Sequence, residues 1–283
     1  MATILDGKAL ANSILSALKE RIGDIMDNGN VPPSLLVVQV GDDPASNVYI
    51  KNKERACNEL GIRFTHYKLS KDITPDTFQQ KLQKLRNLHH DGFMVQLPLP
   101  SQLDQQDIRK NIPSANDVDG LSIKNMGLFY GNCGNPLIPC TPKGILRLLK
   151  AYAIPLEGKN AVVVGRSSIV GKPIAHLLLN ENCTVTVCHS RTVNLESFTR
   201  NADILVSAVG RPKIITADMI KPGAAVIDVG INRENGKLCG DVDFEMAKEV
   251  AGWITPVPGG IGPLTIAMLM ENIVEVAEQR DWW

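Results

Sequence analysis

The sequence predicts an α/β protein built from two domains. Short apolar runs that suit strands alternate with longer segments of helical spacing, the pattern of a largely parallel sheet covered by helices. A proline- and glycine-rich stretch at 98–141 interrupts this alternation, and 283 residues exceed what one hydrophobic core usually supports. We therefore predict a first domain over 1–141, completed by a C-terminal helix at 264–283, and a second domain over 142–263.

The first domain is expected to open with a helix. Apolar residues recur at helical spacing from Leu10 to Ile25, which gives a long helix one apolar face. The run from Leu35 to Val40 suits a buried strand and ends in a Gly-Asp-Asp-Pro turn. The further elements expected here are a helix at 45–60 that stops at Gly61, a strand at 62–69, a helix at 75–90, a strand at 93–97, and short helices near 104–111 and 121–130.

The second domain is expected to repeat the alternation more regularly. Residues 161–164 are all apolar, which is typical of a parallel strand buried on both faces. The loop at 256–263 is rich in glycine and proline and leads into the last helix. The elements expected around them are helices at 142–151 and 171–180, strands at 184–188, 204–207 and 225–228, and a final helix at 264–279.

Composition excludes several classes of function. Thirty basic residues balance thirty acidic ones and aromatic residues make up only 5%, so neither the positive field nor the stacking surface of a nucleic-acid binder is expected. Asp6 and Lys8 interrupt the apolar stretch that a signal peptide needs, and no apolar run approaches the length of a membrane span. We expect a cytoplasmic protein with no nucleic-acid or membrane partner.

The six cysteines show no metal-binding pattern. None of them forms a Cys-x-x-Cys pair, and the five histidines are not spaced around them as zinc ligands are. We predict reduced thiols, no structural disulfide and no metal.

A nucleotide site is predicted at the start of the second domain. The strand at 161–164 runs into Gly165-Arg166-Ser167, and a helix follows at Gly171. A strand, a glycine turn and a helix N-terminus together present backbone N–H groups to a phosphate. The spacing departs from Gly-x-Gly-x-x-Gly, because Ser167 stands at the middle position and Gly171 falls one residue late. An ordinary strand-to-helix turn is the alternative, but the context favours a Rossmann-like dinucleotide-binding domain.

The second strand of this domain favours NADP over NAD. Enzymes that use NAD usually place a carboxylate about 20 residues beyond the glycine turn, where it binds the ribose 2′-hydroxyl. Here the strand ends in Cys188-His-Ser190-Arg191-Thr192, without a carboxylate. A 2′-phosphate prefers cations and hydroxyl donors, and Ser190, Arg191 and Arg166 are the candidates. A solvated surface position is the alternative explanation for Arg191.

Candidate chemical groups lie in the first domain. Tyr49 and Lys53 are four residues apart and share a helix face, where a desolvated lysine beside a phenol can exchange protons. A half-buried tyrosine next to a solvated lysine has the same spacing. Gln96 ends a predicted strand, where ligands of α/β sheets bind, but a structural cap is equally ordinary there. Asp117 and Asp119 occupy a turn that needs no chemistry to explain them.

These segments together resemble the bifunctional methylenetetrahydrofolate dehydrogenase/cyclohydrolase family over essentially the full length. Their joint order is far more specific than any one of them. The matching segments are Ile4-Leu-Asp-Gly-Lys-Ala-Leu10, Tyr49-Ile-Lys-Asn-Lys53, Val95-Gln-Leu-Pro-Leu-Pro100, Asp117-Val-Asp-Gly-Leu121, Gly165-Arg-Ser-Ser-Ile-Val-Gly171 and Pro258-Gly-Gly-Ile-Gly-Pro-Leu-Thr265.

The resemblance implies two linked reactions in a cleft between a catalytic domain and an NADP-binding domain. Methylenetetrahydrofolate gives a hydride to NADP⁺, and the methenyl product is hydrolysed to 10-formyltetrahydrofolate. It implies catalytic roles for Lys53, Gln96, Asp119 and Tyr49. It implies substrate contacts from Tyr49, Gln96, Leu97, Asp119, Pro258, Gly259 and Gly260, and cofactor contacts from Gly165, Arg166, Ser167, Ser190 and Ile231. It also implies a homodimer.

Two other classes remain as alternatives. A shikimate-type NADP-dependent dehydrogenase has the same two-domain plan, but it does not account for the Tyr49–Lys53 spacing together with the loop at 258–265. A non-catalytic nucleotide-binding protein is disfavoured by the presence of Lys53, Gln96 and Asp119.

Overall fold

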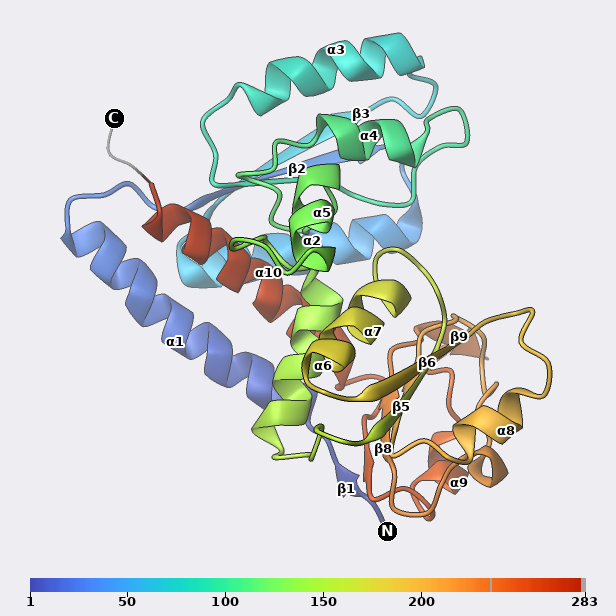
Figure 1. Ribbon diagram of the computed structural model, residues 1–283. Helices are drawn as coiled ribbons and strands as arrows, with labels where there is room; N and C mark the ends of the chain where they lie inside the picture. Colours follow the sequence, from blue (N-terminus) through green and yellow to red (C-terminus); the bar gives the residue numbers. More distant parts are fainter. Residues whose placement is uncertain (235, 281–283) are drawn as a thin grey trace. The chain divides into compact units, whose positions relative to one another are not determined.

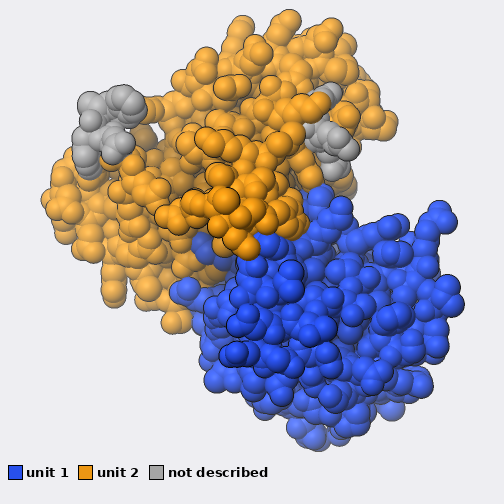
Figure 2. Space-filling view, viewed as in Figure 1, with its two compact units in different colours: residues 1–12, 141–265 blue, residues 13–140, 266–283 orange. Residues whose placement is uncertain are grey.

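The computed structural model describes residues 1–234 and 236–280, without the side chains of 105–107. The chain forms two compact units, coloured separately in Figure 2. Unit 1 comprises Met1–Asn12 and Thr141–Thr265, and unit 2 comprises Ser13–Cys140 and Ile266–Trp283. Each unit has a parallel sheet flanked by helices, so the predicted α/β class is confirmed. Among the described residues no helix combines the length and apolar character that a bilayer crossing requires.

Unit 2 is built on a three-stranded parallel sheet in the order β3-β2-β4. Its central strand β2 (Ser34–Val40) is buried along its whole length, as expected for a strand covered on both faces. Its helices include α2 between β2 and β3, and α3 between β3 and β4 (Figure 1). The other elements of this unit are α2 (Pro44–Leu60), β3 (Arg63–Leu69), α3 (Pro75–Arg86), β4 (Gly92–Val95), α4 (Gln105–Asn111) and α5 (Ile123–Tyr130).

The two faces of this sheet bury different helices. Alternate residues of β2 and β4, such as Val38 and Phe93, join one core with Phe78 of α3 and Ile108 of α4. This alternation follows from the two-residue period of a strand. The opposite face meets α2, and the Cys57 Sγ atom of α2 lies 3.7 Å from the Met270 sulfur of the last helix.

Local sequence signals set the ends of α2, the helix that carries the candidate lysine. The Asp43 side chain accepts a hydrogen bond from the Ser46 N–H, and Pro44 occupies the first turn. Both features stabilise a helix start, because the first N–H groups have no partner within the helix. Gly61 ends the helix with a φ of 76°, a conformation that glycine adopts without strain.

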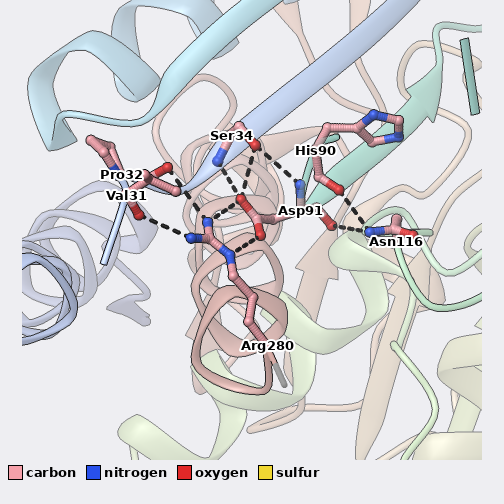
Figure 3. A network of polar contacts seen from close by, with 7 residues as sticks. All are labelled: Val31, Pro32, Ser34, His90, Asp91, Asn116 and Arg280. Atoms are coloured by element: carbon pink, nitrogen blue, oxygen red, sulfur yellow. Dashed lines mark hydrogen bonds and ion pairs between the residues drawn. The ribbon is translucent and has the colours of Figure 1, made fainter. Parts of the chain in front are cut away.

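A largely buried ion pair joins Arg280 to the sheet of unit 2. Figure 3 shows Arg280, just beyond the last helix, against the Asp91 carboxylate at the start of β4. Asp91 also accepts hydrogen bonds from the N–H and hydroxyl of Ser34, at 2.7 and 2.9 Å. Arg280 donates further to the carbonyl oxygens of Val31 (3.0 Å) and Pro32 (3.5 Å). Asp91 is only 6% exposed, and its buried carboxylate has hydrogen-bond donors on both oxygens.

Unit 1 contains a six-stranded parallel sheet in the order β1-β11-β8-β7-β5-β6. The chain runs from β5 outward to β6 on one side and then returns to β7 on the other side. The strand order therefore reverses between β5 and β7, and ligands of open α/β sheets bind at such a switch point, beyond the carboxyl ends of the strands. The strands are β1 (Thr3–Ile4), β5 (Asn160–Val164), β6 (Thr184–Cys188), β7 (Ile204–Ser207), β8 (Ala225–Asp228) and β11 (Trp253–Ile254).

The remaining elements are shorter or are divided between the units. In unit 1 they are α7 (Gly171–Asn180), α8 (Leu195–Thr199), the 3-10 helix Ala217–Met219, the hairpin β9 (Asn232–Glu234) and β10 (Lys237–Cys239), and α9 (Phe244–Ala247). Three helices contribute residues to both units: α1 (Gly7–Asp27), α6 (Cys140–Ala151) and α10 (Ile261–Glu278). The predicted elements were found within a few residues. The short helices α8 and α9, the 3-10 helix and the strands β1, β9, β10 and β11 were not predicted.

Candidate active site

Lys53 is a buried amine in unit 2. It projects from the middle of α2 and is 9% exposed. Its Nζ atom donates a hydrogen bond to Gln96 Oε1 at 2.8 Å and lies 3.5 Å from the Met94 sulfur. Met94 and Gln96 point to the same side of the sheet because they are two residues apart on one extended segment. The packing of α2 against the end of β4 thus brings Lys53 and Gln96 into direct contact.

The surroundings of Lys53 favour its neutral form. Burial lowers the pKa of the Lys53 amine, because an ammonium ion loses its hydration there. The negative charge of Asp119 acts in the opposite direction but does not outweigh burial. The acceptor that Lys53 contacts is an uncharged amide, and within the described residues no salt bridge compensates for desolvation of the cation.

Gln96 is held so that its amide oxygen faces the lysine. Its backbone N–H donates to Val38 O at 2.8 Å, which continues the register of β4 against β2. Its side-chain Nε2 donates to Leu97 O at 2.7 Å. With the amide nitrogen occupied, Oε1 is the atom left to accept from Lys53. Leu97 itself lies partly buried directly after the glutamine.

Tyr49 and Asp119 lie at more accessible positions. Tyr49 is 38% exposed and sits one helical turn before Lys53 on α2. Partial burial raises the pKa of its phenol, which therefore stays protonated at neutral pH. Asp119 is partly buried and close enough to act electrostatically on Lys53.

Asp117 builds the turn that carries Asp119. Its fully buried carboxylate accepts from the N–H groups of Leu121 (3.1 Å) and Ser122 (2.6 Å) and from the Asn125 amide (3.0 Å). The two carboxylates of this turn therefore differ. Asp117 is used up by hydrogen bonds from the following residues, whereas Asp119 remains partly accessible.

The other predicted site residues gather at the carboxyl edge of the unit 1 sheet. Gly165, Arg166 and Ser167 follow β5, Ser190 follows β6, Ile231 follows β8, and Pro258, Gly259 and Gly260 follow β11. Since all six strands are parallel, these loops emerge on one edge. The structure therefore places the five predicted cofactor residues and the glycine-proline loop at the same end of unit 1.

The turn after β5 is tightly packed around its glycines. A Cβ atom on Gly165, whose φ is 130°, would lie 2.5 Å from Ala208 O, and one on Gly171 would lie 2.2 Å from Gly165 O. Only glycine fits both positions. The Ser167 hydroxyl accepts from the N–H groups of Val170 and Gly171, both at 3.2 Å, and these bonds hold the turn that leads into α7.

The loop after β6 carries no carboxylate. The His189 N–H donates to Thr192 Oγ1 at 2.9 Å, and the Arg191 N–H donates to His189 Nδ1 at 3.2 Å. These bonds fold a tight turn that leaves Ser190 and Arg191 exposed at the sheet edge. The environment suits an anionic group.

The fold and these groups define a two-unit α/β protein with a dinucleotide-type sheet in one unit and a buried lysine site in the other. Comparison with known proteins agrees. Residues 5–119 match the model for the catalytic domain of tetrahydrofolate dehydrogenase/cyclohydrolase, and residues 139–281 match the NAD(P)-binding domain of the same family.

Individual relatives match over nearly the whole chain. The bifunctional protein FolD of Halothermothrix orenii is 52% identical, with 97% of this chain and 98% of the relative covered. The crystal structure of the bifunctional enzyme FolD, methylenetetrahydrofolate dehydrogenase/cyclohydrolase, from Campylobacter jejuni has a TM-score of 0.96 at 45% identity, covering 99% of this chain and 100% of that chain. The Trypanosoma brucei enzyme complexed with NADP cofactor and inhibitor has a TM-score of 0.93 at 34% identity, covering 98% of each chain.

The chain belongs to the tetrahydrofolate dehydrogenase/cyclohydrolase family, as the sequence resemblance implied. Methylenetetrahydrofolate dehydrogenase and methenyltetrahydrofolate cyclohydrolase are the two activities of this family. The shikimate-type alternative is much more distant. Shikimate 5-dehydrogenase from Thermus thermophilus is 16% identical with a TM-score of 0.54, covering 87% of this chain and 99% of that chain, a likeness of fold alone.

Proposed function

We propose that this chain oxidises 5,10-methylenetetrahydrofolate with NADP⁺ and hydrolyses the methenyl product to 10-formyltetrahydrofolate. The observation that carries the hydrolytic half is the buried Lys53 amine held by the neutral oxygen of Gln96. Family membership supports the pairing of the two reactions.

Lys53 acts as the proton acceptor in hydrolysis. Water adds to the methenyl carbon of the cation, and the water proton passes to the neutral amine. The bond from this carbon to N5 then breaks as the carbonyl C=O bond forms. The hydroxyl proton passes to N5, and the formyl group stays on N10. A lysine serves as a base near neutral pH only when its pKa is lowered, and burial lowers the pKa of Lys53. Gln96 keeps the Nζ atom in place without charging it.

Oxidation depends on alignment rather than on acid–base groups. The hydride leaves the methylene carbon with its electron pair and enters the nicotinamide ring, so the protein's task is to hold the two rings together. Gly165, Arg166, Ser167, Ser190 and Ile231 bind the dinucleotide from the carboxyl edge of the unit 1 sheet. The absence of a carboxylate after β6 and the exposed Ser190 support NADP rather than NAD.

The folate is bound by groups from both parts of the sequence. Tyr49 stacks on the aminobenzoyl ring, Asp119 accepts hydrogen bonds from the pterin N–H groups, and Leu97 and Gln96 line the same pocket. We also assign Pro258, Gly259 and Gly260 to the folate, because the loop after β11 offers a flat stretch of backbone. We assign folate binding to 1–141 with 264–283, and dinucleotide binding to 142–263. The two family matches, at 5–119 and 139–281, support this division.

The protein acts as a cytoplasmic homodimer in this proposal. Light scattering coupled to gel filtration tests the dimer, and a monomeric mass at micromolar concentration contradicts it. Among the described residues no cluster of His, Cys, Asp and Glu side chains forms a metal site.

A spectroscopic assay with methylenetetrahydrofolate tests the function. We expect reduction of NADP⁺ and appearance of the methenyl and then the formyl product, with a much higher kcat/KM for NADP⁺ than for NAD⁺. Comparable kcat/KM values for the two dinucleotides would contradict the assignment of the loop after β6. No turnover with either dinucleotide, together with oxidation of shikimate, would support the distant alternative.

A further inference from the structure

Unit 1 contains a carboxylate that five donors surround. Asp241 lies between β10 and α9 and is completely buried. Its Oδ2 atom accepts from Ser207 Oγ (3.1 Å) and from the N–H groups of Val209 (2.8 Å) and Gly210 (3.3 Å). Its Oδ1 atom accepts from the Arg211 N–H (2.9 Å) and the Asn232 amide (3.0 Å). One side chain therefore holds the end of β7, the loop that follows it and the start of β9.

A second buried carboxylate fixes the backbone of Asp241. Asp228, at the end of β8, accepts from the N–H groups of Asp241 and Val242, both at 2.9 Å, and from Gly230 at 3.1 Å. The packing leaves no room for other side chains. A Cβ atom on Gly230 would lie 2.0 Å from an Asp241 carboxylate oxygen, and one on Gly240 would lie 1.8 Å from an Asp228 oxygen.

The loop at 208–211, which Asp241 holds, lies beside the switch point of the sheet. The glycine turn at 165–171 follows β5, and the loop at 208–211 follows β7, the strand on the other side of the reversal. Gly165 and Ala208 are in close contact, since a Cβ atom on Gly165 would lie 2.5 Å from Ala208 O. The position of the loop at 208–211 therefore sets the space in which a dinucleotide meets the glycine turn.

The same pair also brackets Ile231, one of the predicted cofactor residues. Its neighbours Gly230 and Asn232 donate to Asp228 and Asp241, respectively. Ile231 itself makes no such bond through its side chain, which is 48% exposed at the carboxyl edge of the sheet. The buried carboxylates thus determine where an exposed apolar side chain stands.

The chemistry of the contacts explains why an aspartate is needed. A buried carboxylate without a cation is stable only when N–H and O–H donors satisfy both oxygens. Within the part of the chain that the structure describes, neither Asp228 nor Asp241 forms an ion pair, and most of their donors are backbone N–H groups. An asparagine has one acceptor oxygen, so its NH₂ group would face backbone N–H groups in either orientation.

We propose that Asp241 is a positioning residue of the dinucleotide site, which fixes the loop at 208–211 and the backbone around Ile231 without touching the cofactor. The proposal rests on the proposed function of unit 1. It predicts a defect in dinucleotide binding and oxidation that spares hydrolysis, because the cyclohydrolase step uses no dinucleotide.

The test compares Asp241→Asn with the wild-type chain and with Asp218→Asn, a control at an exposed carboxylate of the same unit. We expect the KM and Kd for NADP⁺ of Asp241→Asn to rise about tenfold or more, since several charge-assisted bonds are lost, while cyclohydrolase turnover stays unchanged. Asp218→Asn is expected to match the wild type in its KM for NADP⁺, its Kd for NADP⁺ and its cyclohydrolase turnover. An unchanged Kd for NADP⁺ in Asp241→Asn would overturn the proposal.

Hydrogen exchange followed by mass spectrometry separates positioning from folding. Faster exchange confined to 207–211 and 230–232, with β5 still protected, supports a positioning role. Loss of protection throughout β5 to β8 would show that Asp241 serves the stability of the whole unit and would overturn the proposal. If Asp241→Asn is insoluble, Ser207→Ala removes one of the five bonds, and an unchanged Kd for NADP⁺ in that variant overturns it as well.

A failure of the proposed function looks different. If the wild-type chain binds NADP⁺ but does not oxidise methylenetetrahydrofolate, the proposed reaction is wrong. The positioning role of Asp241 is still tested in that case, because it depends on the Kd for NADP⁺ of Asp241→Asn alone.

Discussion

Lys53 Nζ and Gln96 Oε1 are 2.8 Å apart, although 43 residues separate them in the sequence. The contact joins the middle of α2 to the end of β4, and both side chains are at least nine-tenths buried. An uncharged acceptor favours the ammonium form less than a carboxylate would, so this contact fits the base that we propose Lys53 to be.

Gln96→Glu is expected to slow hydrolysis by charging Lys53. A carboxylate at this distance would favour the ammonium form, and the pH at which the cyclohydrolase rate is half-maximal should rise by about 1–3 units. Gln96→Ala removes the hydrogen bond without adding charge, so it serves as the control and should lower the rate with a smaller shift of the profile. Superimposable pH profiles for the wild type and Gln96→Glu would show that Lys53 does not titrate in the reaction.

The lowered pKa of Lys53 also makes stability depend on pH. The unfolded chain keeps the lysine proton up to its ordinary pKa of about 10.4, whereas the folded chain releases it at lower pH. Between these two pKa values the unfolded state binds more protons, so the free energy of unfolding rises with pH.

Lys53→Met should remove this contribution. Urea titrations between pH 7 and about 10 should give a stability difference, wild type minus variant, that rises by at most about 1.4 kcal/mol per pH unit. A difference that is constant over this range would mean that burial does not perturb the amine.

Asp117→Asn is expected to weaken folate binding while sparing the dinucleotide. The carboxylate accepts from two backbone N–H groups and the Asn125 amide, and an asparagine cannot accept on both of its terminal atoms. The turn that carries Asp119 should loosen, with kcat/KM for the folate falling about tenfold at an unchanged Kd for NADP⁺. Asp72→Asn, at an exposed site of the same unit, is the control. Equal kcat/KM values in both variants would refute the role of Asp117.

Two ion pairs of the last helix and the residues after it test how burial changes the contribution of an ion pair to stability. Asp91 and Arg280 form a largely buried pair, whereas Arg21 and Glu278 form a half-exposed one at 2.6 Å. Asp91→Ala should lower the free energy of unfolding by about 3–5 kcal/mol, because it leaves a guanidinium without its partner. Glu278→Ala should cost about 1 kcal/mol or less. Similar losses in the two variants, measured by urea unfolding, would contradict the contrast.

Much of the fold was predictable because its elements are long and apolar. The strand predicted at 35–40 is β2, and the helix predicted at 45–60 is α2 with its glycine end. The helix predicted at 75–90 ends at Arg86, because its apolar face, with Phe78, Leu82 and Leu85, is complete there. Strands β1 and β11 have two residues each, which is too short for any periodic pattern.

Site residues were predictable only where their spacing in the sequence places them on one helix face or in one turn. Tyr49 and Lys53 share a helix face, and the glycine turn lies between a strand and a helix, so both could be singled out. The contact of Lys53 with Gln96 depends on the pairing of β2 with β4, which local patterns do not encode. The role of Asp241 could not be predicted, because four of its five donors lie 30 or more residues away and three of the five are backbone N–H groups, which leave no motif in the sequence.

The most direct measurement is the cyclohydrolase rate of Lys53→Met beside Lys51→Met, a control at an exposed lysine of the same helix. Loss of a general base should reduce hydrolysis of methenyltetrahydrofolate by a factor of about 10² to 10⁴ in Lys53→Met, with the Kd for NADP⁺ unchanged and Lys51→Met fully active. Wild-type hydrolysis in a folded Lys53→Met protein would contradict the assignment of Lys53 as the base.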